Sequence, residues 1–197
     1  MKRLFDFTLA LVSIIIVLPV LLLIALAIWI EDKGSVVFIQ ERVGQKNKNF
    51  YIYKFRTMGC GSSPNGHLTV GHDDVRVTKT GKFLRRYKLD ELPQLINIVK
   101  GDMSFVGPRP ELRHYVNFYK EADYEIFQVK PGLTGLASLK FFNEAELLNT
   151  VADPEAYYIA TIIPNKLAIN KHYIKTRSFV LDVKILWFTF IRIMFNN

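Results

Sequence analysis

The sequence contains a single cysteine, Cys60, among its 197 residues. No disulfide can therefore form within the chain, which excludes a disulfide-stabilised scaffold and leaves nothing that requires an oxidising compartment. The sequence also has no internal repeat and no low-complexity tract. Its length suits one globular domain with a substantial core and is short for two.

Negative charge is the scarcer sign, with 18 acidic against 26 basic side chains and a net charge of +8. A basic surface suits an anionic partner, which could be nucleic acid, a membrane face or a phosphorylated substrate. Nucleic acid is the weakest of these, because the basic residues are interleaved with acidic ones and no nucleic-acid-binding motif is present. Half of the residues are hydrophobic, and they concentrate toward both ends of the chain.

The N-terminal region contains 24 uncharged residues in a row, from Phe7 to Ile30. As a helix this run would extend about 36 Å, enough to cross the hydrocarbon core of a bilayer. A signal peptide shares its basic start, but the apolar core of a signal peptide spans only about 7–15 residues. Two further interpretations stay open. The helix either spans the membrane, or it is broken at Pro19 and returns to the face it entered from.

The middle of the chain predicts a single α/β unit that is mainly helical, with a small strand element and no separate domains. Residues 35–40 and 50–55 are rich in β-branched and aromatic side chains and predict a hairpin. Helical spacing of apolar residues follows from Lys82 and again from Asp90. Further helices are expected near residues 111–120, 143–150, 154–163 and 166–175. The glycine-rich stretch 58–81 between hairpin and helices is expected to be a loop, either a substrate lid or disordered.

The last apolar segment, residues 178–195, places its polar side chains on one narrow stripe of a helix. Ser178, Asp182, Thr189 and Arg192 follow one another at spacings of four, seven and three. Such an amphipathic helix either lies in the membrane interface or packs on a protein core. We favour the interface, because the N-terminal run already places the protein at a membrane.

The pair Asp90-Glu91 is the first candidate for chemistry. Aspartate is a good N-cap and acidic residues suit the start of a helix, so a purely structural role is open. The same position would keep Asp90 ionised at neutral pH, and carboxylates attack phosphoryl groups to form aspartyl-phosphate intermediates. The neighbouring Glu91 could hold Mg²⁺, which takes one or two carboxylates together with substrate phosphates.

Three arginines near this pair are candidates for phosphate binding. Arg85 precedes Asp90 by five positions, and Arg76 lies before the same helix. Arg109 stands between Pro108 and Pro110, which stiffen its backbone, and a guanidinium on a stiff backbone suits bidentate phosphate binding. Structural salt bridges are the alternative for all three.

Other polar residues carry weaker hypotheses. His67 and His72, with Asp73 and Asp74, match no familiar metal-ligand spacing. Cys60 has no histidine fixed beside it by local sequence, which disfavours a nucleophilic role. The isolated His114 and His172 are expected in surface or core positions.

Several stretches, in this order and spacing, closely resemble the bacterial sugar transferases, also called monotopic phosphoglycosyl transferases. They are KRLFD (residues 2–6), VFIQERVG (37–44), KFRTM (54–58), LDELPQL (89–95), KGDMSFVGPRP (100–110) and PGLTG (131–135). The resemblance covers nearly the whole chain, and the block from residue 88 to residue 110 is its most specific part.

The resemblance implies transfer of a phospho-sugar from a UDP-sugar to polyprenyl (undecaprenyl) phosphate, with release of UMP, as the first membrane step of surface polysaccharide or glycoconjugate synthesis. It implies that Asp90 is the nucleophile of a covalent intermediate and that Glu91, with Asp90, binds Mg²⁺. It links Arg85 and Arg109 to phosphate binding, and Arg76 is expected to assist them.

The resemblance also implies a division of the chain. Residues 1–32 would form a re-entrant helix broken at Pro19. Residues 33–197 would form a catalytic domain that ends in an interfacial helix, in one structural unit with the first. The expected location is the cytoplasmic face of the bacterial inner membrane.

The sequence departs from the usual family pattern in three ways. Leu18 stands where a serine is common before the helix-breaking proline. Ser138 and Phe142 replace a glutamine and an arginine, and Asn170 replaces an aspartate. Because the last two changes fall where sugar or nucleotide contacts are expected, they leave the reaction class alone and the donor sugar open. Lys140 is a candidate to supply part of the missing charge.

Two rival functions share part of this pattern. A hydrolase would use water as the second acceptor in place of the lipid. A non-enzymatic membrane module would keep the basic charge and the apolar helices but would not need Asp90.

Overall fold

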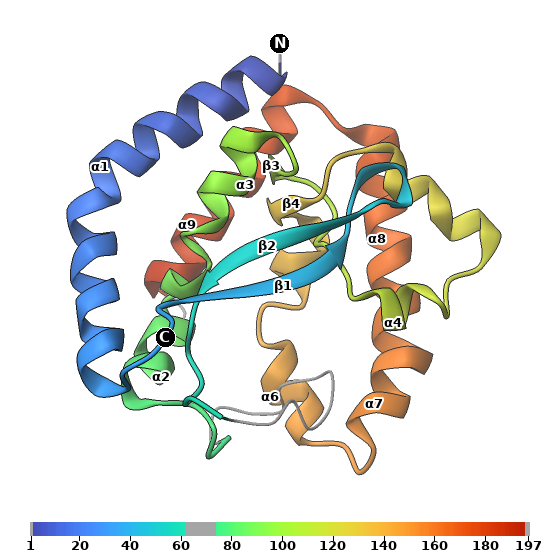
Figure 1. Cartoon of the computed structure of the whole chain (residues 1–197). Coiled ribbons are helices and arrows are strands. Elements are labelled where there is room, and N and C mark those ends of the chain that lie inside the picture. The colour runs from blue at the N-terminus through green and yellow to red at the C-terminus, as the bar shows by residue number, and fades with distance from the viewer. Residues whose placement is uncertain (1, 62–73, 196–197) are drawn as a thin grey trace.

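The computed structural model describes residues 2–61 and 74–195, and it has a mainly helical α/β fold with two small sheets (Figure 1). This confirms the prediction of a mainly helical α/β fold with a small strand element. The longest element is α1, Lys2–Glu31, which contains Pro19 and curves along one side of the molecule (Figure 1). The helix continues through Pro19 without interruption. The path of α1 through a bilayer stays a prediction.

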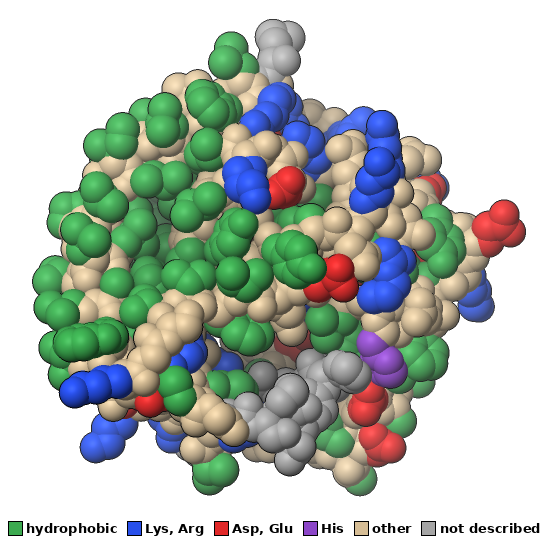
Figure 2. Space-filling view, viewed as in Figure 1, with side chains coloured by type: hydrophobic (Ala, Val, Ile, Leu, Met, Phe, Trp, Pro, Cys, Tyr) green, Lys and Arg blue, Asp and Glu red, His purple; other side chains and the backbone are tan. Residues whose placement is uncertain are grey.

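Helix α1 is long and apolar enough to cross a membrane, and most of its large side chains point away from the protein. Leu4, Ile15, Ile16, Leu22, Leu23 and Ile30 are each more than 60% exposed. Figure 2 shows hydrophobic side chains gathered over α1 and continuing onto the hairpin beside it. An apolar surface of this extent indicates a membrane-associated protein.

The inner side of α1 is joined to the rest of the fold by polar contacts. Oδ2 of the buried Asp6 accepts a hydrogen bond of 2.8 Å from Ser104 Oγ, and the Arg3 guanidinium donates to the carbonyl of Val99 at 2.7 Å. Lys2 forms an ion pair with Asp182 near the start of the last helix. The apolar helix therefore packs on the protein as well as presenting a surface to lipid.

The predicted hairpin is confirmed as β1, Val37–Val43, and β2, Asn49–Phe55. The strands pair antiparallel from Val37 opposite Phe55 to Val43 opposite Asn49, and the 3-10 turn Gln45–Asn47 connects them. The outer edge of β2 is covered by Asn97, which is fully buried. Its Oδ1 accepts from the Tyr53 amide at 3.1 Å and its Nδ2 donates to the Tyr51 carbonyl at 2.7 Å.

The second sheet pairs two short parallel strands, β3, Ser104–Val106, and β4, Gly132–Thr134. This pairing places the turn after β3 next to the turn after β4. A Cβ on Gly132 would lie 2.1 Å from the Gly107 nitrogen, so only glycine permits this approach. The proline-flanked turn that carries Arg109 is thereby held against the body of the protein.

The helices after the hairpin surround these strands, as Figure 1 shows. They are α2 (Lys79–Arg86), the 3-10 turn η2 (Leu89–Glu91), α3 (Gln94–Lys100), α4 (Arg113–Val116), the 3-10 segment η3 (Glu121–Gln128), α5 (Leu136–Lys140), α6 (Glu144–Asn149), α7 (Pro154–Tyr157), the π-helical turn η4 (Tyr158–Ile162), α8 (Ile163–Thr176) and α9 (Phe179–Phe195).

Two helix predictions need correction. The helix expected over residues 111–120 is only four residues long in α4, because the chain turns at Asn117 and continues as η3. The helix expected to open at Asp90 begins only at Gln94, after the separate turn η2. Pro93 stands between the two, where it has no amide hydrogen to contribute.

Helix α9 is amphipathic with its polar side turned inward. Asp182 is buried and accepts from the Tyr173 hydroxyl at 2.6 Å, and the hydroxyls of Thr189 and Thr134 lie 2.8 Å apart. The outward side presents Trp187 and Phe188, which are 60% and 56% exposed. The apolar side of α9 thus faces away from the protein, as a membrane-facing helix requires.

Candidate functional site

Asp90 and Glu91 lie in the tight turn η2, directly after a residue with an unusual backbone. Lys88 has φ +55° and ψ +21°, the left-handed conformation that non-glycine residues seldom adopt. Both carboxylates are buried, with 9% of each residue exposed. Asp90 caps neither η2 nor α3, whose cap residues are Lys88 and Pro93. The structural explanation of Asp90 as a helix cap is therefore wrong.

Glu91 is enclosed by two cations from distant parts of the chain. Lys54, near the end of β2, donates to Oε1 at 3.1 Å. Arg109 donates to both carboxylate oxygens, with 3.0 Å between its Nη1 and Oε2. Burial alone would raise the pKa of Glu91, but Arg109 and Lys54 outweigh it and hold that pKa well below the usual range. Glu91 is therefore a carboxylate under all ordinary conditions.

Asp90 has the opposite environment. Burial, and then the negative charge of Glu91, raise its pKa, while Lys54, Lys88 and Arg85 act in the other direction. Among residues 2–61 and 74–195, no group hydrogen-bonds to its Oδ1, although that atom is buried. A buried acceptor without a partner is costly, so Asp90 Oδ1 marks a position where a ligand group is expected.

Of the other two predicted arginines, Arg85 lies near Asp90 and Arg76 is bound elsewhere. Arg85 donates to Thr57 Oγ1 at 2.8 Å and is close enough to Asp90 for the two charges to interact. Arg76 forms a two-pronged pair with Asp74, with 2.6 Å between Nη2 and Oδ2, and that pair in turn acts on Arg85. The structure thus brings Arg85 and Arg109 to the carboxylate pair and holds Arg76 on a third carboxylate.

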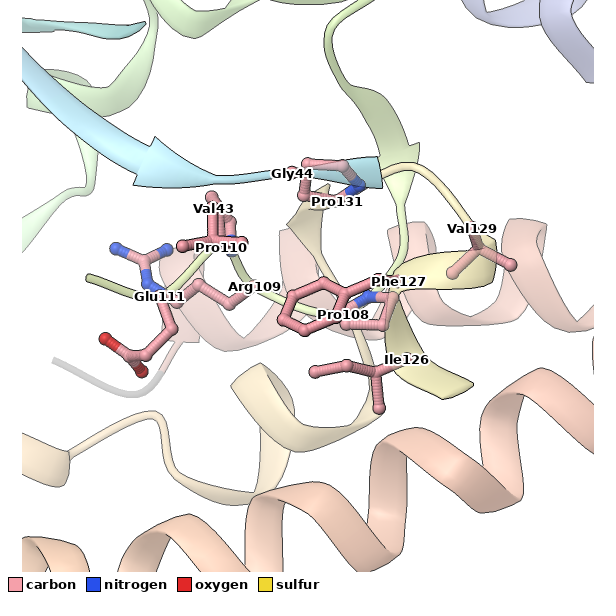
Figure 3. Close-up of a pocket in the computed structure, with 10 residues that line it drawn as sticks. All are labelled: Val43, Gly44, Pro108, Arg109, Pro110, Glu111, Ile126, Phe127, Val129 and Pro131. Atoms are coloured by element: carbon pink, nitrogen blue, oxygen red, sulfur yellow. The ribbon is translucent and has the colours of Figure 1, made fainter. Parts of the chain in front are cut away.

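Arg109 also borders a polar cavity of about 210 Å³. The cavity is lined by charged and hydroxyl-bearing side chains together with a few apolar ones: Arg42, Arg109, Pro110, Glu111, Leu112, Tyr115, Glu144, Ala145, Leu148, Tyr158 and Lys166. Figure 3 shows Arg109 and Glu111 extending away from the apolar group around Pro108 and Phe127. Arg109 therefore lines the cavity and also binds Glu91.

The polar lining of this cavity is internally ordered. The Tyr158 hydroxyl donates to Glu111 Oε2 at 2.6 Å and accepts from Lys166 Nζ at 3.1 Å. Arg42 pairs with Glu111 at 3.3 Å, and Lys166 pairs with Glu144. Tyr158 opens the π-helical turn η4, a geometry that occurs frequently at functional sites.

The carboxylate pair fits Mg²⁺ in part. Asp90 Oδ1 is an open, buried oxygen of the hard type that Mg²⁺ prefers. Both oxygens of Glu91 already accept from Lys54 or Arg109. No cluster of three or more His, Cys, Asp or Glu able to hold a metal occurs within the described part of the chain. A metal here would therefore depend on substrate oxygens for most of its ligands.

The weaker candidates stay apart from this site where they are described. Cys60 is exposed and its thiol contacts Arg56, while His114 pairs with Glu155 at 3.3 Å. His67, His72 and Asp73 lie outside the described residues, as does half of the expected loop 58–81.

Sequence reasoning missed Lys54 and the cavity residues. Lys54 ends an alternating strand, where a basic residue usually faces solvent, and only the packing of β2 on η2 turns it toward Glu91. Tyr158, Lys166 and Glu144 carry no local motif. Their common feature is a position on helices that converge on the Arg109 turn, which is a property of the fold.

A buried carboxylate pair surrounded by cations, together with an exposed apolar helix, indicates a membrane-associated protein that binds anionic substrates. The comparison with known families is more specific. The family described as "Bacterial sugar transferase" matches residues 1–196. The chain belongs to this family.

Curated relatives agree with this assignment. The chain is 38% identical over 191 residues to the UDP-N-acetylgalactosamine-undecaprenyl-phosphate N-acetylgalactosaminephosphotransferase of Aeromonas hydrophila, covering 95% of this chain and 42% of that protein. It is 37% identical over 198 residues to the uncharacterized sugar transferase EpsL of Bacillus subtilis, covering 100% and 89%. It is 35% identical over 200 residues to the UDP-glucose:undecaprenyl-phosphate glucose-1-phosphate transferase of Klebsiella pneumoniae, covering 100% and 40%. The chain thus spans about two fifths of the first and third of these relatives.

Proposed function

We propose that this protein transfers a sugar 1-phosphate from a UDP-sugar to undecaprenyl phosphate, releases UMP, and so begins the synthesis of a surface polysaccharide or glycoconjugate. Family membership and the names of the Aeromonas and Klebsiella relatives support the reaction class. The observation that carries the proposal is the buried Oδ1 of Asp90, which has no hydrogen-bond partner among the described residues, beside Glu91 with its two bound cations.

The reaction proceeds in two displacements at one phosphorus atom. A carboxylate oxygen of Asp90 attacks the phosphorus that bears the sugar, the bond to the bridging diphosphate oxygen breaks, and UMP leaves with that electron pair. An oxygen of the lipid phosphate then attacks the same phosphorus. The bond to Asp90 breaks in this second step, which restores the carboxylate and gives the lipid diphosphate sugar.

The surrounding cations stabilise the charge that builds up on the diphosphate. Arg85 interacts with Asp90 and Arg109 with Glu91, and Arg76 is proposed to assist them in binding the diphosphate. Lys54, Lys88 and Arg85 also oppose the burial that raises the pKa of Asp90, so they favour the ionised form needed for attack.

Mg²⁺ is the proposed cofactor, held by Asp90 Oδ1 and Glu91 together with substrate phosphate oxygens. When bound, it would offset negative charge on the diphosphate. Glu91 would offer an oxygen to the metal if Arg109 bound the substrate phosphate in place of Glu91.

The membrane part of the proposal concerns α1. The helix enters the cytoplasmic face of the bacterial inner membrane and returns to it, with Pro19 at the bend. The curved course of α1 supports this arrangement, and so do contacts of both its ends with the rest of the protein. Asp6 bonds to Ser104 near the first end, and Glu31 at the other end accepts from the amides of Lys79 and Thr80. The outward side of α9 rests in the interface of the same leaflet.

The polar cavity beside Arg109 is proposed to hold the donor sugar. Its volume of about 210 Å³ suits a single sugar ring, and carboxylate, hydroxyl and cationic groups on its wall match sugar hydroxyls. Because Arg109 borders both the cavity and Glu91, a sugar placed there has its 1-phosphate directed at the carboxylate pair.

The deciding experiment measures UMP release in nanodiscs with Mg²⁺, undecaprenyl phosphate and a panel of UDP-sugars. We expect Asp90→Asn to lower release at least about 1000-fold, because it removes the nucleophile. Asp102→Asn is the matched control, an aspartate at the far end of α3 whose contact is a pair with Lys100. Full activity of Asp90→Asn would refute the mechanism. Free sugar phosphate in place of the lipid product would instead identify a hydrolase.

A further inference from the structure

Two cations, Lys88 and Arg192, meet at one aromatic ring. The Nζ of Lys88 lies 5.1 Å from the centroid of the Phe142 ring, and the Cζ of Arg192 lies 5.3 Å from it. The three residues come from three different elements: Lys88 precedes η2, Phe142 follows α5, and Arg192 lies in the last turns of α9. The ring offsets part of the cations' repulsion through its negative face.

Polar atoms near this cluster lack partners. The Arg192 Nε and the Ser138 Oγ are buried, and neither has a hydrogen-bond partner among the residues that the structure describes. Ser138 lies on α5, which packs against α9. An unsatisfied guanidinium nitrogen costs more than a neutral group would, since its desolvation penalty is that of a charge. A ligand that supplies acceptor oxygens would remove this cost.

The cluster acts on the reacting carboxylate. Lys88 stands two residues before Asp90, and its positive charge acts to lower the pKa of both Asp90 and Glu91. Its strained backbone fixes the direction in which the side chain leaves the turn. The cluster is therefore next to the nucleophile, and it is built from residues other than those that hold Glu91.

The opposite side of the cluster borders the apolar surface of α9. Phe188 and Phe195 lie four residues before and three residues after Arg192, so they are its neighbours on the helix surface. Both are exposed, at 56% and 77%. Arg192 thus stands at the boundary between the side chains that face lipid and the turn that carries Asp90.

We propose that Lys88 and Arg192, gathered at the Phe142 ring, bind the phosphate of the lipid acceptor while its polyprenyl chain stays along the exposed face of α9. The inference rests on the proposed function. The acceptor must bring a charged phosphate to Asp90 and keep a long apolar tail in the membrane. The Lys88–Phe142–Arg192 cluster combines cations, polar atoms without a partner in the described part of the chain, and an adjoining apolar surface.

The same cations could instead serve the diphosphate of the donor, and the two steps of the reaction separate these sources. The full-length protein in nanodiscs, mixed with UDP-sugar and Mg²⁺ but no lipid phosphate, reports the first step as a burst of UMP. Addition of undecaprenyl phosphate at increasing concentrations then reports the second step as lipid-linked product. Arg192→Gln removes the charge and retains part of the side chain's length.

We expect Arg192→Gln to leave the rate and size of the UMP burst within about twofold and to raise the KM for undecaprenyl phosphate about tenfold or more, the loss of one charge-assisted contact. Arg192→Lys should recover much of the affinity. Lys184→Gln is the matched control, because it removes an exposed cation from the same helix. Lys88→Asn, which tolerates the left-handed backbone, should also raise the lipid KM.

An unchanged lipid KM in Arg192→Gln would overturn the inference, and so would a UMP burst that slows in parallel with the second step, which would assign the cluster to the donor. A wild-type protein that gives neither burst nor product would count against the proposed function itself. A raised lipid KM with a normal burst supports the acceptor site, because a general loss of folding would reduce both steps.

Discussion

Replacing Asn97 with leucine tests how the carboxylate turn is held against the hairpin. Asn97 is fully buried on α3, and its amide bonds the Tyr53 amide at 3.1 Å and the Tyr51 carbonyl at 2.7 Å. It therefore completes the edge of β2 in place of a third strand. Leucine has a similar shape but satisfies neither backbone group, so Asn97→Leu leaves an N–H and a C=O on the covered edge of β2 without partners.

The magnitude follows from these two groups. Each unsatisfied buried backbone group costs about 1–3 kcal/mol. Burying the leucine side chain in place of the amide returns roughly 1.5 kcal/mol. We expect the free energy of unfolding to fall by about 2.5 kcal/mol, a large fraction of the total stability of a domain.

Guanidinium titration in detergent, followed by near-ultraviolet circular dichroism, measures this change. Ile96→Asn is the matched control, because it places the same amide on the adjacent, half-exposed position of α3. The control should change stability by less than about 0.5 kcal/mol. If Asn97→Leu were as stable as the wild type, the edge bonds would contribute nothing and the reasoning would be refuted.

Two further predictions concern the proposed reaction. Lys54→Met removes a cation that acts to lower the pKa of Asp90. Because the ionised carboxylate is the proposed nucleophile, the acidic limb of the pH–rate profile should move to higher pH. Lys100→Met alters an exposed lysine and should leave that limb in place. Tyr158→Phe removes a hydroxyl from the proposed sugar cavity. It should raise the KM for UDP-sugar about tenfold while the inhibition constant of UMP, which has no sugar to place, stays constant; equal weakening of both would place the nucleotide there instead.

Local sequence patterns predict the elements whose causes are local. The length and apolar composition of residues 7–30 predict a helix, and the β-branched and aromatic residues of 35–40 and 50–55 predict strands, because each signal is contained within a few neighbouring residues. The turns around Arg109 and Gly132 were also predictable from their prolines and glycines. Their pairing through β3 and β4 was not, since it joins segments that are far apart in the chain.

The site shows the same division. From the sequence alone, Asp90 could be either a helix cap or a nucleophile, and the cap role is excluded only by the structure, where Lys88 and Pro93 are the cap residues. The cations around Glu91 were also unpredictable, because Lys54 and Arg109 approach from the hairpin and from the turn after β3. The polar stripe of α9 was predicted, but not its inward direction, because the stripe is matched by Tyr173 and Thr134. Phe142 was noted as a departure from the family pattern, and only the fold brings Arg192 onto its ring.

The contacts of α1 have a consequence for how the chain is made. Lys2 meets Asp182, which lies 180 positions later, and Asp6 meets Ser104, 98 positions later. At a synthesis rate of about 5–20 residues per second, Asp182 is made roughly 10–35 s after Lys2. During that interval α1 is a newly made apolar segment whose inward side is unmatched. We therefore expect the bilayer to receive the helix first, so that the remainder of the protein assembles on a segment already held in lipid.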